Sequence, residues 1–255
     1  MEIAEHIKSL AAEGQLLADA AERAGTGAPV PTCPGWHVRD LVRHTGMVHR
    51  WATAFVAEGY TSYRPAAGEP DLDGAELLGW FREGHGRLVA ALTEAPDALE
   101  CWAFLPAPSP RAFWARRQAH ETAVHRVDAQ AALGDDVVPE VPAAFAADGI
   151  DELLCGMHAR DRSRVRTTEP AVLRVRPTDT GDVWTVRLSD RAPRADRTTE
   201  ADGDLAGEAA DCELSGPAAA LYLTLWNRLP LDAVTVSGDP RPARLWRETS
   251  GITWS

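Results

Sequence analysis

The 255-residue chain has a single lysine, Lys8, among its 26 basic residues, and its 38 acidic residues give a formal net charge of −12. The basic residues form no cluster, which argues against a nucleic-acid partner, because phosphate binding needs a concentrated basic face. No apolar run approaches the roughly 20 residues that span a bilayer. The acidic N-terminus lacks the basic start and apolar core of a secretory signal. These absences predict a soluble, cytoplasmic protein without nucleic-acid or membrane partners.

Cysteines are few and widely spaced, and no C-x-x-C pair is present. The four positions are Cys33, Cys101, Cys155 and Cys212. This spacing favours neither a zinc knuckle nor a redox dithiol. In a reducing cytosol we expect free, buried thiols. With 45% apolar and 25% charged residues, the chain has the balance of a globular protein of one large or two modest domains.

The first half of the sequence has helical periodicity. Ile3, Ile7, Leu10 and Leu17 form one apolar stripe that stops before Gly25. Further helices are expected from residue 37 or 38 to 59, over about 73–92, and over about 111–133. Four helices joined by loops of moderate length predict a bundle over residues 1–138. A fifth, bridging helix is expected within 139–159.

The second half changes to strand-like alternation. Residues 171–176 and 183–188 alternate apolar and polar side chains, with a hairpin turn over 178–181. The remaining expected elements are a strand at 212–215, a helix at 218–227, a strand at 233–236 and a short helix through 245–246. Residues 191–210 favour either a mobile loop or an irregular strand pair. The fold class is therefore α+β, with a helical bundle followed by a smaller domain over 160–255 that contains a mainly antiparallel sheet.

Glu121 and His125 provide the sharpest local signal for chemistry. Residues four apart on a helix lie about 40° apart around its axis, so both side chains point to one face. Such a pair is able to chelate one cation. By itself the spacing is common, and it favours an ordinary polar helix face with one Glu–His hydrogen bond.

His44 strengthens the metal interpretation. It lies on the apolar stripe of the second helix, between Leu41 and Val48, and is therefore expected to point inward. Within one bundle it would face Glu121 and His125. Two nitrogen ligands and one oxygen ligand leave a fourth position open, which is the pattern of catalytic rather than structural zinc.

Two motifs resemble the mycothiol-dependent maleylpyruvate isomerase family, which belongs to the DinB-like four-helix metalloproteins. The first runs from Cys33-Pro34-Gly35-Trp36 to His44, and the second runs from Ala119 to Asp128. The segments Trp226-Asn227-Arg228 and 234–239, together with Trp246, resemble the C-terminal domain of that family. The chain departs from the family pattern at His37, where a Thr or Ser helix cap is expected.

The resemblance implies a DinB-like bundle, a sterol-carrier-protein-like C-terminal domain, and a metal held by His44, Glu121 and His125. It also implies mycothiol as the thiol cofactor or co-substrate. A divalent ion, most plausibly Zn²⁺, would activate this thiol to isomerise, or transfer sulfur to, a small electrophilic substrate that bears a carboxylate. Arg228 would anchor this carboxylate, since guanidinium pairs with it through two hydrogen bonds.

Several roles stay open at this point. His37 is expected to cap its helix or to be exposed, and His120 either to support the site or to face solvent. Core packing is favoured over pocket lining for the aromatic residues Trp102, Phe104 and Trp114. Contacts between helices are expected for His49 and Arg50. Two alternative functions remain, a hydrolase that uses metal-bound water and a non-catalytic metal-binding protein, and the expected assembly is a monomer or weak homodimer.

Overall fold

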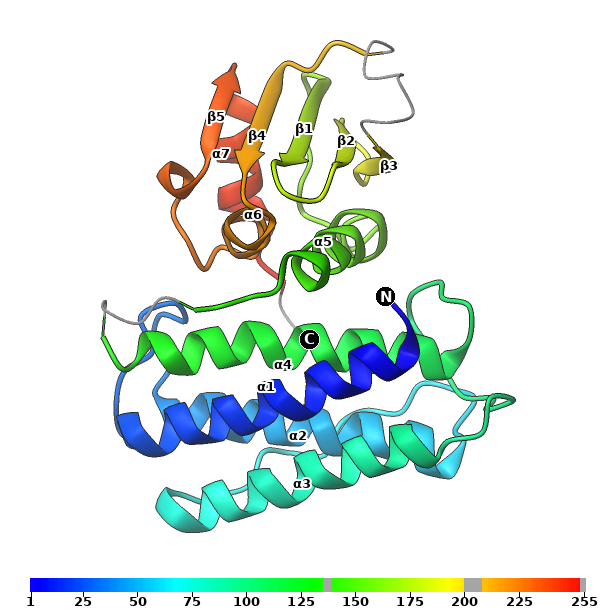
Figure 1. Ribbon diagram of the computed structural model, residues 1–255, viewed down its shortest axis with the longest axis vertical. Helices are drawn as coiled ribbons and strands as arrows, with labels where there is room; N and C mark the ends of the chain where they lie inside the picture. Colours follow the sequence, from blue (N-terminus) through cyan, green and yellow to red (C-terminus); the bar gives the residue numbers. More distant parts are fainter. Residues whose placement is uncertain (135–138, 200–207, 253–255) are drawn as a thin grey trace. The chain divides into compact units, whose positions relative to one another are not determined.

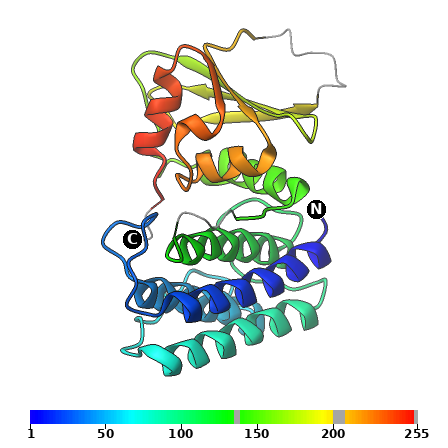
Figure 2. The same ribbon diagram turned by 60° about the vertical axis from the view of Figure 1, so that its left-hand side comes forward.

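In the computed structural model, residues 1–134, 139–199 and 208–252 are described, and the chain forms two compact units, Met1–Pro139 and Glu140–Ser255 (Figure 1). The first unit consists of four helices, which confirms the predicted bundle. They are α1 (Ile3–Ala24), α2 (Val38–Glu58), α3 (Gly74–Glu94) and α4 (Pro110–Ala131). Both α1 and α2 pack against α3 and α4 (Figure 2). Each of the four helices therefore has buried residues along at least one side.

The ends of these helices follow from local side-chain chemistry. Ser109 precedes α4 and its hydroxyl accepts a hydrogen bond from the N–H of Ala112 at 3.1 Å, with Pro110 in the first turn. At the end of α2, Gly59 adopts a left-handed conformation with φ of 63°, which costs glycine little. These signals explain why the predicted helix limits lie within a few residues of the observed ones.

Two apolar clusters fill the bundle. One joins Leu17, Leu41, Leu77 and Phe81 from α1, α2 and α3. The other is aromatic and joins α2 and α4 to the loop after α2 and the loop before α4. Its members, linked by ring contacts, are Trp51, Phe55, Tyr60, Tyr63, Trp102, Phe104, Phe113 and Trp114. Trp114 is fully buried, which confirms its predicted core role.

The second unit combines helices with one sheet. Its helices are α5 (Ala143–Asp151), the π-helix η1 (Glu152–Met157), α6 (Ala218–Leu225), the 3₁₀-helix η3 (Leu231–Ala233) and α7 (Arg241–Thr249). Its strands are β1 (Ala171–Pro177), β2 (Asp182–Leu188), β3 (Arg194–Thr199), β4 (Cys212–Gly216) and β5 (Thr235–Gly238). The α+β class predicted for this half is confirmed.

The five strands are ordered β3-β2-β1-β4-β5. Only the β1–β4 pair is parallel, so the sheet is mainly antiparallel, as predicted. Leu173 of β1 lies opposite Val186 of β2 and Cys212 of β4, and all three are buried. Both α6 and α7 contact β1 and β4, which places the centre of this second core between these helices and the middle of the sheet.

Three details of the prediction are wrong. Within 191–210, residues 194–199 form a regular strand paired with β2, where a loop or irregular pair was expected; residues 200–207 lie outside the described part. The strand expected from residue 233 begins at Thr235, because Leu231–Ala233 turn as a 3₁₀-helix. The helix expected through 227 ends at Leu225, and Asn227 has a left-handed φ of 63°.

The helix predicted over 139–158 is present in two parts. It begins at Ala143 as α5 and continues from Glu152 as the π-helix η1. It belongs to the second unit, where α5 packs against α6. The sterol-carrier-protein-like character of this unit remains a prediction. No helix in the described part of the chain combines the length and apolar character that crossing a membrane requires.

Candidate metal centre

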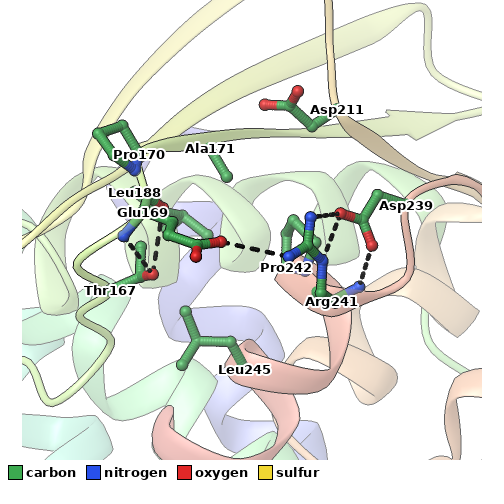
Figure 3. A pocket seen from close by; sticks show the side chains of 10 residues that line it. All are labelled: Thr167, Glu169, Pro170, Ala171, Leu188, Asp211, Asp239, Arg241, Pro242 and Leu245. Carbon is green, nitrogen blue, oxygen red and sulfur yellow. Dashed lines mark hydrogen bonds and ion pairs between the residues drawn. The ribbon is translucent and has the colours of Figure 1, made fainter.

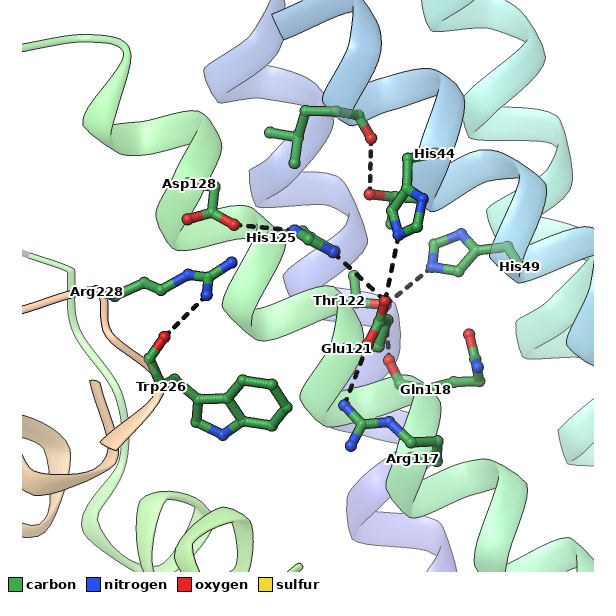
Figure 4. A network of polar contacts seen from close by, with 12 residues as sticks. His44, His49, Arg117, Gln118, Glu121, Thr122, His125, Asp128, Trp226 and Arg228 are labelled. Atoms are coloured by element: carbon green, nitrogen blue, oxygen red, sulfur yellow. Dashed lines mark hydrogen bonds and ion pairs between the residues drawn. The ribbon is translucent and has the colours of Figure 1, made fainter. Parts of the chain in front are cut away.

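Three buried side chains from α2 and α4 meet within the first unit (Figure 4). His44 comes from α2, and Glu121 and His125 lie one turn apart on α4. The Nε2 atoms of His44 and His125 lie 3.6 and 3.4 Å from Oε1 of Glu121. The structure therefore brings together the three residues that the sequence analysis singled out.

The spacing of these atoms fits a divalent cation. Metal–ligand bonds of about 2.0–2.2 Å place neighbouring ligand atoms of a tetrahedral ion about 3.3–3.6 Å apart. Both measured N–O separations fall in this range, and one ligand atom from each residue lies within 4.8 Å of the others. Oε1 of Glu121 is buried and accepts no hydrogen bond from any described residue. Such an atom is costly to bury without a partner, and the three ligand atoms form a group that could hold a metal ion.

Further residues surround the two imidazoles. Nδ1 of His125 lies 2.9 Å from Oδ2 of Asp128, and the hydroxyl of Thr32 donates to Oδ1 of the same carboxylate at 2.6 Å. The Trp36 ring lies 5.2 Å from the His44 ring and 6.4 Å from the His125 ring. The carboxylate of Asp128 and the indole of Trp36 therefore lie beside the two imidazoles, and neither residue was among the predicted ligands.

The site favours positive charge. Burial alone would raise the pKa of Glu121, but contacts with His125 and His44 and the charge of Arg117 hold it well below its usual range. Burial would lower the pKa of His125, but the hydrogen bond to Asp128, the contact with Glu121 and the charges of both carboxylates raise it to about 9. Both pKa shifts indicate a negative electrostatic potential between these side chains. A bound cation would take the place of the proton on His125.

The neighbours of the site confirm the predicted contacts between helices. Thr122 donates its hydroxyl to the carbonyl of Gln118 at 2.7 Å and lies 2.8 Å from Nε2 of His49, so His49 donates Nε2–H to it. Arg50 donates to the carbonyl of Trp80 on α3 at 2.7 Å. On the other side of Glu121, Nη2 of Arg117 lies 3.3 Å from Oε2, which leaves Oε1 facing the two histidines.

Family models cover nearly the whole chain. The N-terminal domain of mycothiol maleylpyruvate isomerase matches residues 7–130, and the C-terminal domain of the same family matches residues 144–244. The chain belongs to this family. The two motifs that contain His44, Glu121 and His125 lie within the first match, and the Trp226-Asn227-Arg228 segment lies within the second.

Solved structures agree on the fold of this family member. Crystal structures of the mycothiol-dependent maleylpyruvate isomerase and of a histidine-to-alanine mutant of it superpose with TM-scores of 0.63 and 0.62. Each is 14% identical to this chain, and each comparison covers 93% of both chains. At this identity the likeness establishes the fold alone. No curated protein matches the sequence.

Arg228, predicted to anchor a substrate carboxylate, follows α6 in the second unit. Nη1 of Arg228 donates to the carbonyl of Trp226 at 2.8 Å. The intervening Asn227 is the one non-glycine residue with positive φ in the described part of this family member. A turn of this kind ends the helix sharply and sets the direction in which Arg228 leaves it, and the anchoring role stays a prediction.

Two histidines of uncertain role are now placed. His37 directly precedes α2, its backbone N–H donates to Oδ2 of Asp40 at 2.8 Å, and its side chain is 43% exposed. It therefore occupies the predicted capping position. His120 is fully buried and its ring lies 6.1 Å from that of His6 on α1, so the alternative in which it faces solvent is wrong.

A hollow of about 210 Å³ lies in the second unit (Figure 3). Arg241, the one basic residue among those that line it, already bonds Asp239 and lies 3.2 Å from Glu169. None of the polar side chains that line the hollow is buried. The positive charge of Arg241 is therefore already paired with carboxylates, and the hollow has no buried polar group that would bind a ligand.

Sequence reasoning missed Asp128, Thr32 and Trp36 as parts of the site. Asp128 had a readable signal, because it follows His125 by three residues and so lies on the same side of α4. Thr32 had none, since its contact with Asp128 joins positions 96 residues apart. Trp36 belongs to the Pro-Gly-Trp motif, yet nothing in the motif itself shows which rings the indole contacts.

Proposed function

We propose that this chain is a metal-dependent enzyme that activates mycothiol to isomerise, or transfer sulfur to, a small electrophilic substrate that carries a carboxylate. The observation that carries the proposal is a set of three ligand atoms, in which the Nε2 atoms of His44 and His125 lie beside Oε1 of Glu121, an atom without a hydrogen-bond partner among the described residues. Family membership supports mycothiol as the thiol, and the name of the solved enzyme supports a substrate like maleylpyruvate.

His44, Glu121 and His125 would hold the ion, and two imidazoles with one carboxylate suit Zn²⁺ with an open position. When bound, such an ion supplies a Lewis acid that lowers the pKa of a thiol in that open position. Arg117 binds Oε2 of Glu121 at 3.3 Å, which would leave Oε1 free to hold the ion. Helices α2 and α4 supply all three ligands, and rigid elements hold such a geometry better than loops do.

An isomerisation of this kind forms one carbon–sulfur bond to the substrate, allows rotation about the former double bond, and then breaks the same carbon–sulfur bond. The thiol is regenerated and no oxidant or reductant is consumed. If a leaving group departs instead, the product is a thiol conjugate. Both outcomes need the same ligand set, and the chemistry of the substrate decides between them.

Arg228 is proposed to bind the substrate carboxylate through two parallel hydrogen bonds. Replacement of Arg228 with Lys keeps the charge but removes this two-bond geometry. We expect a raised KM in Arg228→Lys and a larger loss of kcat/KM in Arg228→Ala. An unchanged KM for both variants would remove Arg228 from the proposal.

The decisive experiment measures turnover of maleylpyruvate by Zn²⁺-loaded protein with and without mycothiol. We expect activity only when both are present, and loss of activity in Glu121→Gln, which weakens the ion's only carboxylate ligand. Glu58→Gln is the matched control, because Glu58 is exposed at the end of α2 and should leave activity unchanged.

Other outcomes of this assay would identify the competing functions. Zn²⁺-dependent turnover without mycothiol would favour a hydrolase, and tight Zn²⁺ binding without any turnover would favour a non-catalytic metal-binding protein. A thiol-dependent reaction requires a reducing compartment, so we place the enzyme in the cytoplasm. A monomer or weak homodimer is the assembly we expect, and sedimentation of the loaded protein tests it.

A further inference from the structure

The turn of residues 29–37, here called the tryptophan turn, has a backbone fixed by its own hydrogen bonds. The N–H of Val30 donates to the carbonyl of Trp36 at 2.9 Å, and the N–H of Trp36 donates to the carbonyl of Cys33 at 3.0 Å. Gly35 has a φ of 87°, which glycine adopts without steric cost. The turn is therefore a preformed unit that holds Trp36 in place at the start of α2.

Thr32 connects this turn to a metal ligand. Its hydroxyl donates to Oδ1 of Asp128 at 2.6 Å, and Oδ2 of the same carboxylate lies 2.9 Å from Nδ1 of His125. Asp128 is fully buried, so its carboxylate has little freedom to turn away. With Nδ1–H donated to Asp128, the lone pair of neutral His125 is on Nε2 and points toward Glu121.

His44 is held in a different way. Its Nδ1 lies 3.8 Å from Oε1 of Glu69, beyond hydrogen-bond distance, and the Glu69 side chain is 45% exposed. The contact of His44 with the tryptophan turn is the Trp36 ring, at 5.2 Å and an angle of 61°. The two imidazoles thus differ, because one is fixed by a buried carboxylate and the other has only a long contact with an exposed one.

We propose that Asp128 and Thr32 are positioning residues, through which the tryptophan turn fixes the tautomer and orientation of His125 for metal binding. The role rests on the proposed metal-dependent function and extends it to residues that do not touch the ion. Carboxylates that orient metal-binding histidines affect metal affinity strongly. Thr32 contributes by directing the carboxylate, and so acts one step further from the ion.

The test measures Zn²⁺ affinity by competition with a chelator at pH 9.5, where protons compete little for the imidazole ligands. We expect Asp128→Asn to weaken binding about 10–100-fold and Thr32→Val about 2–10-fold. Thr32→Ser restores the hydroxyl and should lie within about twofold of wild type. Glu69→Gln is the matched carboxylate control and should also lie within about twofold.

The visible absorption spectrum of the Co²⁺-loaded protein gives a second readout, since it reports ligand geometry independently of fold stability. We expect it to change in Asp128→Asn and Thr32→Val and to be restored in Thr32→Ser. Wild-type affinity and spectrum in both altered variants would overturn the positioning role while leaving the proposed function intact. No Zn²⁺ binding by wild type would overturn both. If Asp128→Asn fails to fold, the Zn²⁺ affinities and Co²⁺ spectra of Thr32→Val and Thr32→Ser still test the positioning role.

Discussion

Zinc binding is expected to displace a proton from His125. With a pKa of about 9, this imidazole is almost fully protonated at pH 7.5, and its Nε2 must lose the proton before it coordinates an ion. The competing proton weakens apparent binding by a factor of 1 + 10^(9−pH), which is about 100 at pH 7 and 2 at pH 9. Apparent affinity should therefore rise about 50-fold over this range, or about 2 kcal/mol.

Calorimetric titration with chelated Zn²⁺ in buffers of different ionisation enthalpy counts the released protons. Asp128→Asn is the comparison, because the Asp128 charge and hydrogen bond raise the pKa of His125. The variant should release fewer protons at pH 8 and show a flatter dependence of affinity on pH. Any ionisation of a group bound to the metal occurs in both proteins and cancels in the difference. Equal proton release by both proteins, or a wild-type affinity independent of pH between 7 and 9, would refute the reasoning.

Three further predictions concern stability and are checked by unfolding of the purified chain. Glu13 and Arg126 form a buried ion pair at 2.6 Å, so Glu13→Ala should lower the free energy of unfolding in urea by about 3–5 kcal/mol, and Glu58→Gln, at an exposed site, should not. A Cβ at residue 46 would lie 2.2 Å from the Trp80 ring, so Gly46→Ala should lower Tm and cost about 1–3 kcal/mol; an unchanged Tm would contradict this packing. Burial lowers the pKa of His158 from 6.5 to about 4, so stability present above pH 6.5 should be lost as pH falls toward 4, by about 3 kcal/mol. The same acid loss in His158→Asn would show that another group is responsible.

The helices were predictable because their signals are local. Apolar spacing marks the buried side of α1 and α2, while glycine and the Ser109-Pro110 pair mark helix ends. The π-helical continuation of α5 has no such signal, since it depends on how the backbone accommodates its surroundings. Edge strand β3, with the sequence Arg-Ala-Asp-Arg-Thr-Thr, lacks apolar alternation because nearly all of its side chains are exposed, and only its pairing with β2 defines it.

At the candidate metal centre, too, features with a local sequence signal were predictable and features that depend on tertiary packing were not. Glu121 and His125 were identified by their helical spacing, and His44 by its place on an apolar stripe. Their convergence was expected from the inward direction of His44 within one bundle and from the motif resemblance, but neither gave the distances between the ligand atoms. The link from Thr32 to Asp128 depends on how the tryptophan turn packs on α4, and no pattern along the chain encodes that distance.

His44 and Glu121 are separated in the sequence by the rest of α2, all of α3 and the first half of α4. A ribosome must therefore release nearly the whole first unit before the ion has its three ligands, since His44 alone or the Glu121–His125 pair offers only weak chelation. Metal acquisition should then follow closure of the bundle, and free Zn²⁺ in excess of its Kd would stabilise the closed form by mass action. If the ion binds as proposed, a cell starved of it would hold this chain in a less stable and less active form.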